Sequence, residues 1–161
     1  CSRAKTRPMA HIHEKIDFTA SVYIVKDGCV LLHKHKKLGI WLQPGGHVEL
    51  DEDPVEAAKR EAKEETGFDV ELVGQSNPPA ELYGHSRNLL LPMFLNRHNF
   101  DDTHEHIDFS YFGRVVGGEL TPEGGVEMRW FTREEIEKNE IKLLDDTRSY
   151  ALSALDYFAQ Q

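Results

Sequence analysis

Residues 46–68 read GHVELDEDPVEAAKREAKEETGF, and this stretch predicts a loop followed by the clearest helix of the chain. Asp53 can cap the N-terminus of the helix, and Pro54 suits its first turn, where no amide hydrogen is needed. Gly67 can end the helix, because glycine readily adopts the left-handed conformation of a C-terminal cap. The sequence therefore places a helix at residues 53–66.

Three glutamates of this helix can share one site. Glu61, Glu64 and Glu65 are spaced i, i+3 and i+4, so they project from one side of a helix. Crowded carboxylates repel one another and are stabilised by cations between them, and oxygen ligands suit hard divalent ions such as Mg²⁺ or Mn²⁺. Three glutamates alone would more often belong to a solvated surface helix, so the surrounding residues decide the interpretation.

Those surrounding residues follow a defined pattern. The chain reads Gly46, five residues, Glu52, seven residues, and then REAKEETGF at residues 60–68. This pattern resembles the Nudix box, the signature of the Nudix hydrolase family. Ala62 and Phe68 stand where a larger aliphatic residue is commoner in the family. Both are apolar, so these departures affect packing rather than chemistry.

The resemblance implies a role for each polar residue of the box. Family members generally bind divalent metal through the last two glutamates of the box, often with its preceding glutamate and a backbone carbonyl just before the box. In this sequence the implied ligands are Glu64, Glu65, Glu61 and Gly45. Glu52 and Arg60 would support them, with Arg60 orienting a carboxylate through a charge-assisted hydrogen bond. The implied cofactor is Mg²⁺ or Mn²⁺.

The implied reaction is hydrolysis of a phosphoanhydride bond. It requires neutralised phosphate oxygens and an activated water, and bound magnesium can provide both. A general base would take the proton of the water, and the family often draws this base from the helix or from a later loop. Glu65, Glu123 and Glu127 are the candidates. Glu123 and Glu127 are not ranked, because the loop that contains them varies in length across the family.

Histidines form the second group of candidate site residues. His104, His106 and Asp108 lie on one side of an expected strand, because side chains alternate between its faces. They can contact substrate, hold another metal, or form an exposed polar face. Of these three interpretations, an exposed polar face is slightly favoured over metal binding, and it is as well supported as substrate contact. The candidate substrate-binding residues are His47, His104, His106 and Tyr83; His33 and His35 are expected at the solvated end of a hairpin.

Alternating and helical patterns outside the box define the fold class. Apolar residues alternate along residues 18–24 and predict a strand with one buried face, which a tight turn at Asp27-Gly28 joins to a second strand. Further strands are expected at residues 68–75, 89–96 and 106–116. Thr132 and Glu135 form a capping-box pattern that starts a short helix, and a last helix is expected at about 146–158. Together with the resemblance, these elements predict an α/β fold, a Nudix-type α/β/α sandwich with a mixed central sheet.

Composition limits the class of protein. The 161 residues fit a flexible N-terminal tail at residues 1–15 and a single domain at residues 16–161. A net charge of -9 without a basic patch disfavours nucleic-acid polymers and anionic membranes as partners, whereas bound cations can make an acidic site attract a small phosphorylated substrate. Two cysteines form no paired motif, and no apolar run has transmembrane length, so the cytoplasm is the expected compartment. A homodimer is expected only by analogy with the family.

The expected function is a metal-dependent hydrolase that cleaves a phosphoanhydride bond in a nucleoside-diphosphate-linked small molecule. The leading candidate substrates are nucleoside triphosphates or modified nucleotides, and the next candidates are nucleotide sugars and dinucleoside polyphosphates. Isomerisation of isopentenyl diphosphate, known for some proteins with this fold, is disfavoured because neither Cys1 nor Cys29 lies near the relevant loops. The non-enzymatic alternative is a nucleotide-sensing Nudix domain without turnover, but such domains often lose the metal-binding glutamates.

Overall fold

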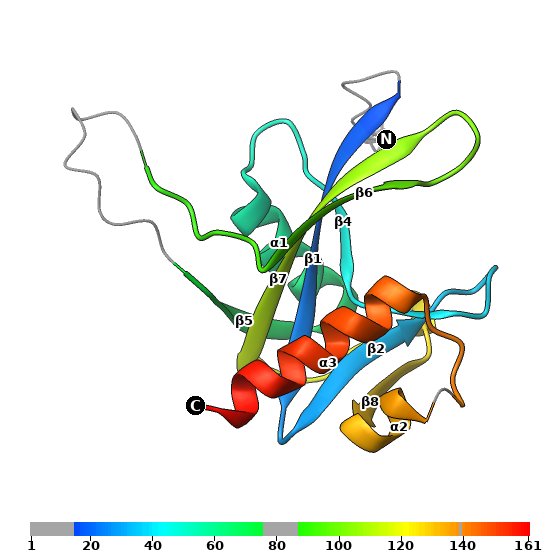
Figure 1. Cartoon of the computed structure of the whole chain (residues 1–161). Helices are drawn as coiled ribbons and strands as arrows, with labels where there is room; N and C mark the ends of the chain where they lie inside the picture. Colours follow the sequence, from blue (N-terminus) through cyan, green and yellow to red (C-terminus); the bar gives the residue numbers. More distant parts are fainter. Residues whose placement is uncertain (1–14, 76–86, 139) are drawn as a thin grey trace, which may run out of the picture.

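Two long parallel strands form the centre of the sheet. In the computed structural model, which describes residues 15–75, 87–138 and 140–161, β1 (Ile16–Lys26) pairs in parallel with β7 (Glu105–Gly118) (Figure 1). The other strands are β2 (Cys29–Lys34), β3 (Trp41–Leu42), β4 (Gly45–His47), β5 (Phe68–Val73), β6 (Phe94–Asn99) and β8 (Met128–Thr132). Strands β2 and β4 pair antiparallel with β1, and β5 and β6 pair antiparallel with β7. The described residues thus form one eight-stranded mixed sheet, as expected.

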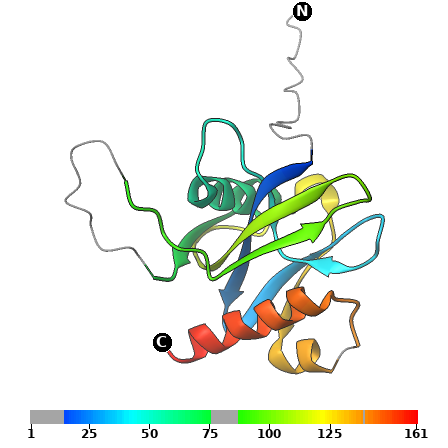
Figure 2. The same cartoon turned by 45° about the horizontal axis from the view of Figure 1, so that its top comes forward.

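Helices cover both faces of the sheet. Helix α1 (Pro54–Thr66) and helix α3 (Asp145–Ala159) lie on opposite sides of β1 (Figures 1 and 2). The short helix α2 (Arg133–Glu137) follows β8. The core under α1 contains Ala20, Val22, Ile24, Ala58 and Ala62, and the core under α3 contains Tyr23, Phe112, Phe131, Ala151 and Leu155. This arrangement confirms the α/β/α sandwich.

Helix α1 begins and ends where the sequence indicates. The Asp53 carboxylate accepts hydrogen bonds from the amides of Val55 and Glu56 at 2.9 and 3.0 Å, and the Glu56 side chain accepts one from the Asp53 amide at 3.0 Å. This reciprocal capping box satisfies amides that have no partner inside the helix. Gly67 ends the helix with φ of 80°, and its amide donates to the carbonyl of Lys63. The caps hold the glutamate side of α1 in a fixed position beside β4.

Strand β1 is buried on both faces, so the expectation of one buried face is wrong. Thr19, Ser21 and Tyr23 are buried as well as the apolar residues between them. Thr19 and Ser21 donate hydrogen bonds to the Asp108 carboxylate of the neighbouring strand at 2.8 and 2.6 Å. Polar side chains can be buried when such partners satisfy them, so an alternating pattern does not require a solvated face here.

Other boundaries differ modestly from expectation. Strand β6 begins at Phe94 rather than residue 89, after Pro92, which has no amide hydrogen to give to a sheet ladder. Helix α3 begins at Asp145 and ends at Ala159, within one residue of the expected helix at each end. The expected N-terminal tail falls almost wholly outside the described residues and stays a prediction.

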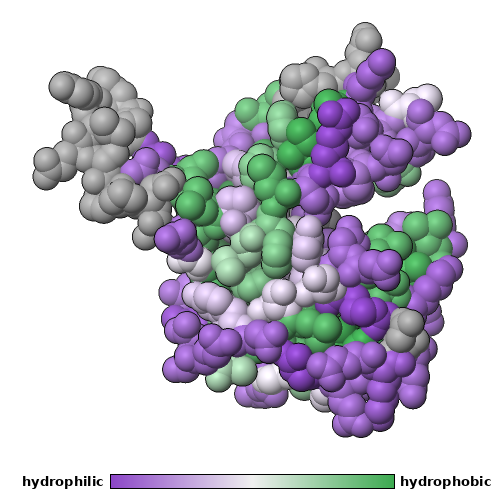
Figure 3. All heavy atoms as spheres, viewed as in Figure 1, coloured by the Kyte–Doolittle hydropathy of each residue, from purple (hydrophilic) through white to green (hydrophobic). Residues whose placement is uncertain are grey.

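The surface is mostly hydrophilic on the face seen in Figure 3. Apolar atoms gather there over β6 and the segment that leads into it, where Leu91 and Leu95 are exposed. A hollow lies between the β6–β7 hairpin and the loop that follows β2. Across the described ranges, no helix is both long enough and apolar enough to cross a membrane.

Candidate active site

The three glutamates of α1 lie on the side of the helix that faces β4. The backbone amide of Gly45 donates a hydrogen bond to Oε2 of Glu65 at 3.0 Å. A Cβ atom at Gly46 would overlap the Glu61 carboxylate, and a Cβ atom at Gly45 would lie 2.6 Å from the carbonyl oxygen of Ala20. The two glycines therefore let β4 pass between β1 and the acidic side of α1, in direct contact with its carboxylates.

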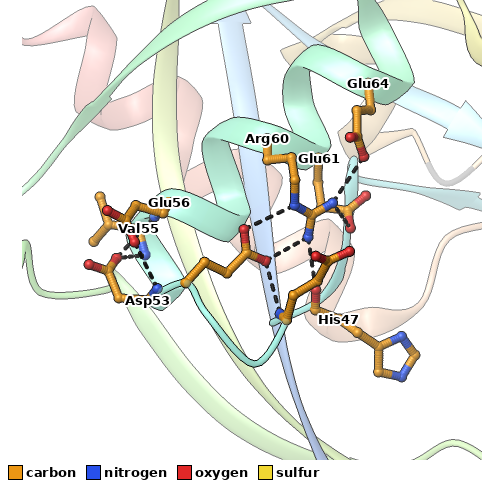
Figure 4. A network of polar contacts seen from close by, with 9 residues as sticks. His47, Asp53, Val55, Glu56, Arg60, Glu61 and Glu64 are labelled. Carbon is orange, nitrogen blue, oxygen red and sulfur yellow. Dashed lines mark hydrogen bonds and ion pairs between the residues drawn. The ribbon is translucent and has the colours of Figure 1, made fainter. Parts of the chain in front are cut away.

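Arg60 connects the carboxylates of the box (Figure 4). Its Nε and Nη2 atoms donate to the two oxygens of Glu52 at 3.0 and 2.7 Å. Its Nη1 atom donates to Glu61 at 2.7 Å and to Glu64 at 2.9 Å. Its Nη2 atom also donates to the carbonyl oxygen of His47 at 3.0 Å. One guanidinium thus joins the helix to the loop before it, which is the geometry expected of a residue that orients the glutamates.

Burial makes the negative charge of the cluster costly. It raises the pKa of Glu65 to about 7, and the charges of Glu61, Glu123 and Glu64 add to the increase although the Gly45 amide opposes it. Burial also raises the pKa of Glu61, against the hydrogen bond from Arg60. Because a nearby cation favours ionised carboxylates, a bound cation would offset this cost.

The donor set fits a hard divalent cation by its chemistry. Glu61, Glu64 and Glu65 offer carboxylate oxygens, the ligands that Mg²⁺ and Mn²⁺ prefer. Arg60 contacts Glu61 and Glu64, whereas Glu65 contacts the Gly45 amide, and the side chain of Glu64 is 56% exposed. Within the described ranges, the potential ligand atoms that all lie within 4.8 Å of one another belong to a different group, formed by Asp17, His47, His104 and His106.

The candidate bases occupy different surroundings. Glu123 lies in the short helical turn η1 (Glu123–Gly125), and its charge contributes to the raised pKa of Glu65. Glu127 is exposed and pairs with Lys34 at 3.1 Å. Glu123 is therefore electrostatically coupled to the cluster, whereas Glu127 is held in an ion pair. The sequence could not rank these two residues.

His33 lies at the glutamate cluster, so its expected place at a solvated hairpin end is wrong. Strand β2 is flanked by β3 and β8, and His33 pairs with Leu42 on one side and Met128 on the other. Its Nδ1 atom lies 3.8 Å from Oε2 of Glu65. Burial, with a contribution from His35, lowers the pKa of His33 to about 4, so the imidazole is neutral at pH 7 and this contact is not an ion pair.

His104 is partly buried and His106 and Asp108 are buried, so the interpretation of these three residues as an exposed polar face is wrong. His106 is 8% exposed and Asp108 is 5% exposed. His104 Nε2 lies 2.8 Å from Oδ2 of Asp17, a residue that the sequence did not single out. Burial and the neighbouring histidines lower the pKa of His106 to about 4, although Asp17 opposes the shift. The missed signal was the polar alternation of Asp17, Thr19 and Ser21 along β1.

Asp108 does not join the histidines. Its carboxylate accepts hydrogen bonds from Thr19 at 2.8 Å, Ser21 at 2.6 Å and Ser110 at 2.6 Å. The candidate substrate residue Tyr83 lies outside the described residues. Substrate contact by His47, His104 and His106 stays a prediction.

His47 connects the glutamate and histidine groups. Its carbonyl oxygen belongs to the Arg60 network, while its ring points away from that network (Figure 4). The ring lies close to His106, with 5.1 Å between the ring centroids. The backbone and side chain of one residue thus take part in two different clusters.

Comparison with known proteins identifies the family. The model of the NUDIX domain matches residues 16–152 of this chain. The chain belongs to the Nudix hydrolase family. This Nudix domain resembles a solved hydrolase of the NUDIX family from Clostridium perfringens, with a TM-score of 0.76, 36% sequence identity, and coverage of 88% of this chain and 97% of that chain.

Two curated relatives match this Nudix domain over part of their length. The "Probable DHNTP pyrophosphohydrolase" of Lactococcus lactis subsp. cremoris is 31% identical over 100 residues, which are 62% of this chain and 55% of that protein. The "MutT-like protein" of Streptomyces ambofaciens is 43% identical over 53 residues, which are 33% of this chain and 34% of that protein. The chain thus spans about half or a third of the length of these curated relatives.

Proposed function

We propose that this Nudix domain is a divalent-metal-dependent pyrophosphohydrolase that cleaves a phosphoanhydride bond of a nucleoside-diphosphate-linked small molecule. The observation that carries the proposal is the glutamate cluster itself. Glu61, Glu64 and Glu65 lie on one side of α1, Arg60 joins two of them, and the Gly45 amide holds the third. Such a cluster of partly buried carboxylates favours a cation and, through the cation, a substrate phosphate.

The ligands of the proposed ion are Glu61, Glu64, Glu65 and the carbonyl of Gly45, and the ion is Mg²⁺ or Mn²⁺. When bound, it neutralises phosphate oxygens and lowers the pKa of a water molecule. Arg60 and Glu52 are positioning residues in this proposal, because they hold the glutamates rather than contact the reacting atoms. Their hydrogen bonds fix the carboxylate orientations before substrate arrives.

Glu65 and Glu123 are the leading candidates to accept the proton of the attacking water. One carboxylate oxygen of Glu65 accepts a hydrogen bond from the Gly45 amide, and this side chain lies beside the neutral His33 ring. Glu123 is exposed on the short turn η1, within electrostatic reach of Glu65. Glu127 is a weaker candidate, because the ion pair with Lys34 engages its carboxylate.

The leading candidate substrates are nucleoside triphosphates or modified nucleotides. The name of the Lactococcus lactis relative, a probable pyrophosphohydrolase, supports cleavage of a pyrophosphate linkage over isomerisation. The presence of Glu61, Glu64 and Glu65 supports turnover over nucleotide sensing. Nucleotide sugars and dinucleoside polyphosphates remain the alternative substrate classes, since specificity depends on loops outside the box. A homodimer remains a prediction.

The test is release of phosphate or pyrophosphate from a substrate panel. The panel contains nucleoside triphosphates, modified nucleotides, nucleotide sugars and dinucleoside polyphosphates, each with Mg²⁺, with Mn²⁺ and with a chelator. Metal-dependent turnover concentrated in one class supports the proposal and names the substrate class. Tight binding of one compound without turnover under any metal condition would instead establish a sensor.

A further inference from the structure

Four side chains outside the α1 cluster converge at the start of the parallel strand pair. They are Asp17 of β1, His47 of β4, His104 just before β7, and His106 at the beginning of β7. Each offers one potential ligand atom, and these four atoms all lie within 4.8 Å of one another. We call this group the histidine cluster.

The sheet register explains why these residues meet. Asp17 is directly opposite His106 in the parallel pair of β1 and β7, and Thr19 is directly opposite His47 in the antiparallel pair of β1 and β4. Residues opposite each other, and residues two apart on one strand, project from the same face of a sheet. The three strands therefore place these side chains on one face.

The histidine cluster is separate from the glutamate cluster. Gly46 faces α1, because a Cβ atom there would overlap the Glu61 carboxylate. His47 is the next residue of the same strand, so its side chain projects from the opposite face. Figure 4 shows the His47 ring directed away from Arg60, Glu61 and Glu64. A ligand held by the histidine cluster would thus be held on the other side of β4.

The cluster surrounds a buried carboxylate with imidazoles. Asp17 is 3% exposed, and its Oδ2 atom lies 2.8 Å from Nε2 of His104 and 3.4 Å from Nε2 of His47. The rings of His47 and His104 stand nearly perpendicular to that of His106, at 82° and 88°. The side chain of His47 is half-exposed, which leaves solvent a route to the group.

We infer that Asp17, His47, His104 and His106 form a second metal site, which binds a transition-metal ion of the zinc type. Three imidazole nitrogens and one carboxylate oxygen suit Zn²⁺ or Co²⁺ rather than Mg²⁺, which prefers oxygen ligands. Four ligands complete a tetrahedral shell. In such a shell the ligand atoms are about 3.3 Å apart. The Asp17 contacts of 2.8 and 3.4 Å are already close to this separation.

Binding at this site would join three strands. It would connect the beginning of β1 and β7 to β4, the strand whose glycines contact the α1 glutamates. A ligand that binds only the folded state stabilises it by mass action, so zinc should raise the melting temperature. The site does not depend on the proposed hydrolase activity, and its tests measure metal binding rather than turnover.

The experiment titrates the full chain, stripped of metal and then saturated with Mg²⁺, with Zn²⁺ by calorimetry and with Co²⁺ by absorption spectroscopy. The wild type should bind one equivalent of either ion at this site, with the strong visible absorption of tetrahedral cobalt. His106→Ala and Asp17→Asn should weaken this binding at least 100-fold. If either variant fails to fold, His47→Ala, at a half-exposed position, makes the same test.

Two matched controls remove similar groups from neighbouring positions. His98 is exposed, with its ring centroid 5.4 Å from that of His106, so His98→Ala should bind as the wild type does. Asp108 lies on the same strand and face as His106, but its carboxylate accepts hydrogen bonds from three hydroxyl groups and does not belong to the histidine cluster. Asp108→Asn should therefore also retain the metal. Glu64→Gln should retain it as well.

Three results would overturn the inference. The first is a wild type that, once saturated with Mg²⁺, binds neither Zn²⁺ nor Co²⁺. The histidine cluster would then be only a hydrogen-bonded group. The second is equal binding by the wild type, His106→Ala and Asp17→Asn. The third is loss of the ion in Glu64→Gln with retention in His106→Ala, which would assign the ion to the glutamates.

Discussion

Arg60 binds both carboxylate oxygens of Glu52, through Nε at 3.0 Å and Nη2 at 2.7 Å. The planar guanidinium makes this two-point contact while a third nitrogen reaches Glu61 and Glu64. A lysine ammonium carries the same charge but lacks the fork, so it cannot reproduce this set of hydrogen bonds. The positions of the glutamates therefore depend on the shape of Arg60 as well as on its charge.

Arg60→Lys should lower the affinity for Mn²⁺ by about 10- to 100-fold, because residues that orient metal ligands have effects of this size. Calorimetric titration of Mn²⁺ measures it. Arg114→Lys is the matched control, because Arg114 forms an exposed pair with Glu71 away from the cluster. Equal Mn²⁺ affinity in the wild type and Arg60→Lys would show that Arg60 does not position the ligands.

Gly46→Ala should separate folding from activity. The new methyl group would collide with the Glu61 carboxylate, which is the end of a flexible side chain and can move away. We expect a melting temperature close to that of the wild type and a turnover at least 10-fold lower. In Gly117→Ala the nearest atom is the Asp69 carboxylate oxygen at 3.3 Å, so this control should change neither quantity. Full turnover in Gly46→Ala would contradict the placement of Glu61 in the site.

The free energy of unfolding of the metal-free protein should change with pH because of Glu65. Its pKa is about 7 in the folded chain against an ordinary 4.5, so the folded state binds more protons between these values. The contribution of Glu65 to the free energy of unfolding is therefore complete below pH 4.5 and lost as the pH rises through 7. Its size should be on the order of 1–3 kcal/mol.

Denaturant unfolding of the wild type and Glu65→Gln in chelator, from pH 4.5 to 8, isolates this contribution. The comparison is needed because His33 and His106 have lowered pKa values and give the opposite slope in both proteins. The wild type should lose stability relative to Glu65→Gln as the pH rises. A constant difference between the two proteins would show that the folded state does not raise the pKa of Glu65.

Asp108→Ala should destabilise the fold by about 2–3 kcal/mol, because it leaves buried hydroxyl groups without their acceptor. Those groups belong to Thr19, Ser21 and Ser110. Asp69→Ala removes an exposed carboxylate paired with Lys63 and should cost less than about 1 kcal/mol. Equal losses of unfolding free energy in the two variants would contradict the structural role of Asp108.

The sequence predicted the parts of the fold that local signals determine. Asp53, Pro54 and Gly67 mark the ends of α1 through capping, which depends only on neighbouring residues. The pattern of the box located Glu52, Arg60 and the three glutamates. The structure joins Glu52, Arg60, Glu61 and Glu64 in one network and places Glu65 against the Gly45 amide. Their roles in metal binding and catalysis stay predictions.

Features that depend on sheet pairing were not predicted. The contact of Asp17 with His104 joins residues 87 positions apart through the β1–β7 register, which no local pattern specifies. His33 looked solvated because it begins a polar run, but strands on both sides of β2 enclose it. Asp108 looked like a partner of the histidines until pairing with β1 supplied its hydroxyl donors.

The most direct test of the central claim compares turnover in the wild type, Glu64→Gln, Glu65→Gln and Glu56→Gln with Mg²⁺ and the preferred nucleotide. Glu56 lies on the same helix outside the cluster, and glutamine can also serve in a capping box. The proposed chemistry predicts losses above about 100-fold for Glu64→Gln and Glu65→Gln, with folding retained and Glu56→Gln within about twofold of the wild type. Turnover near the wild-type level in both Glu64→Gln and Glu65→Gln would contradict metal-dependent hydrolysis at the α1 glutamates.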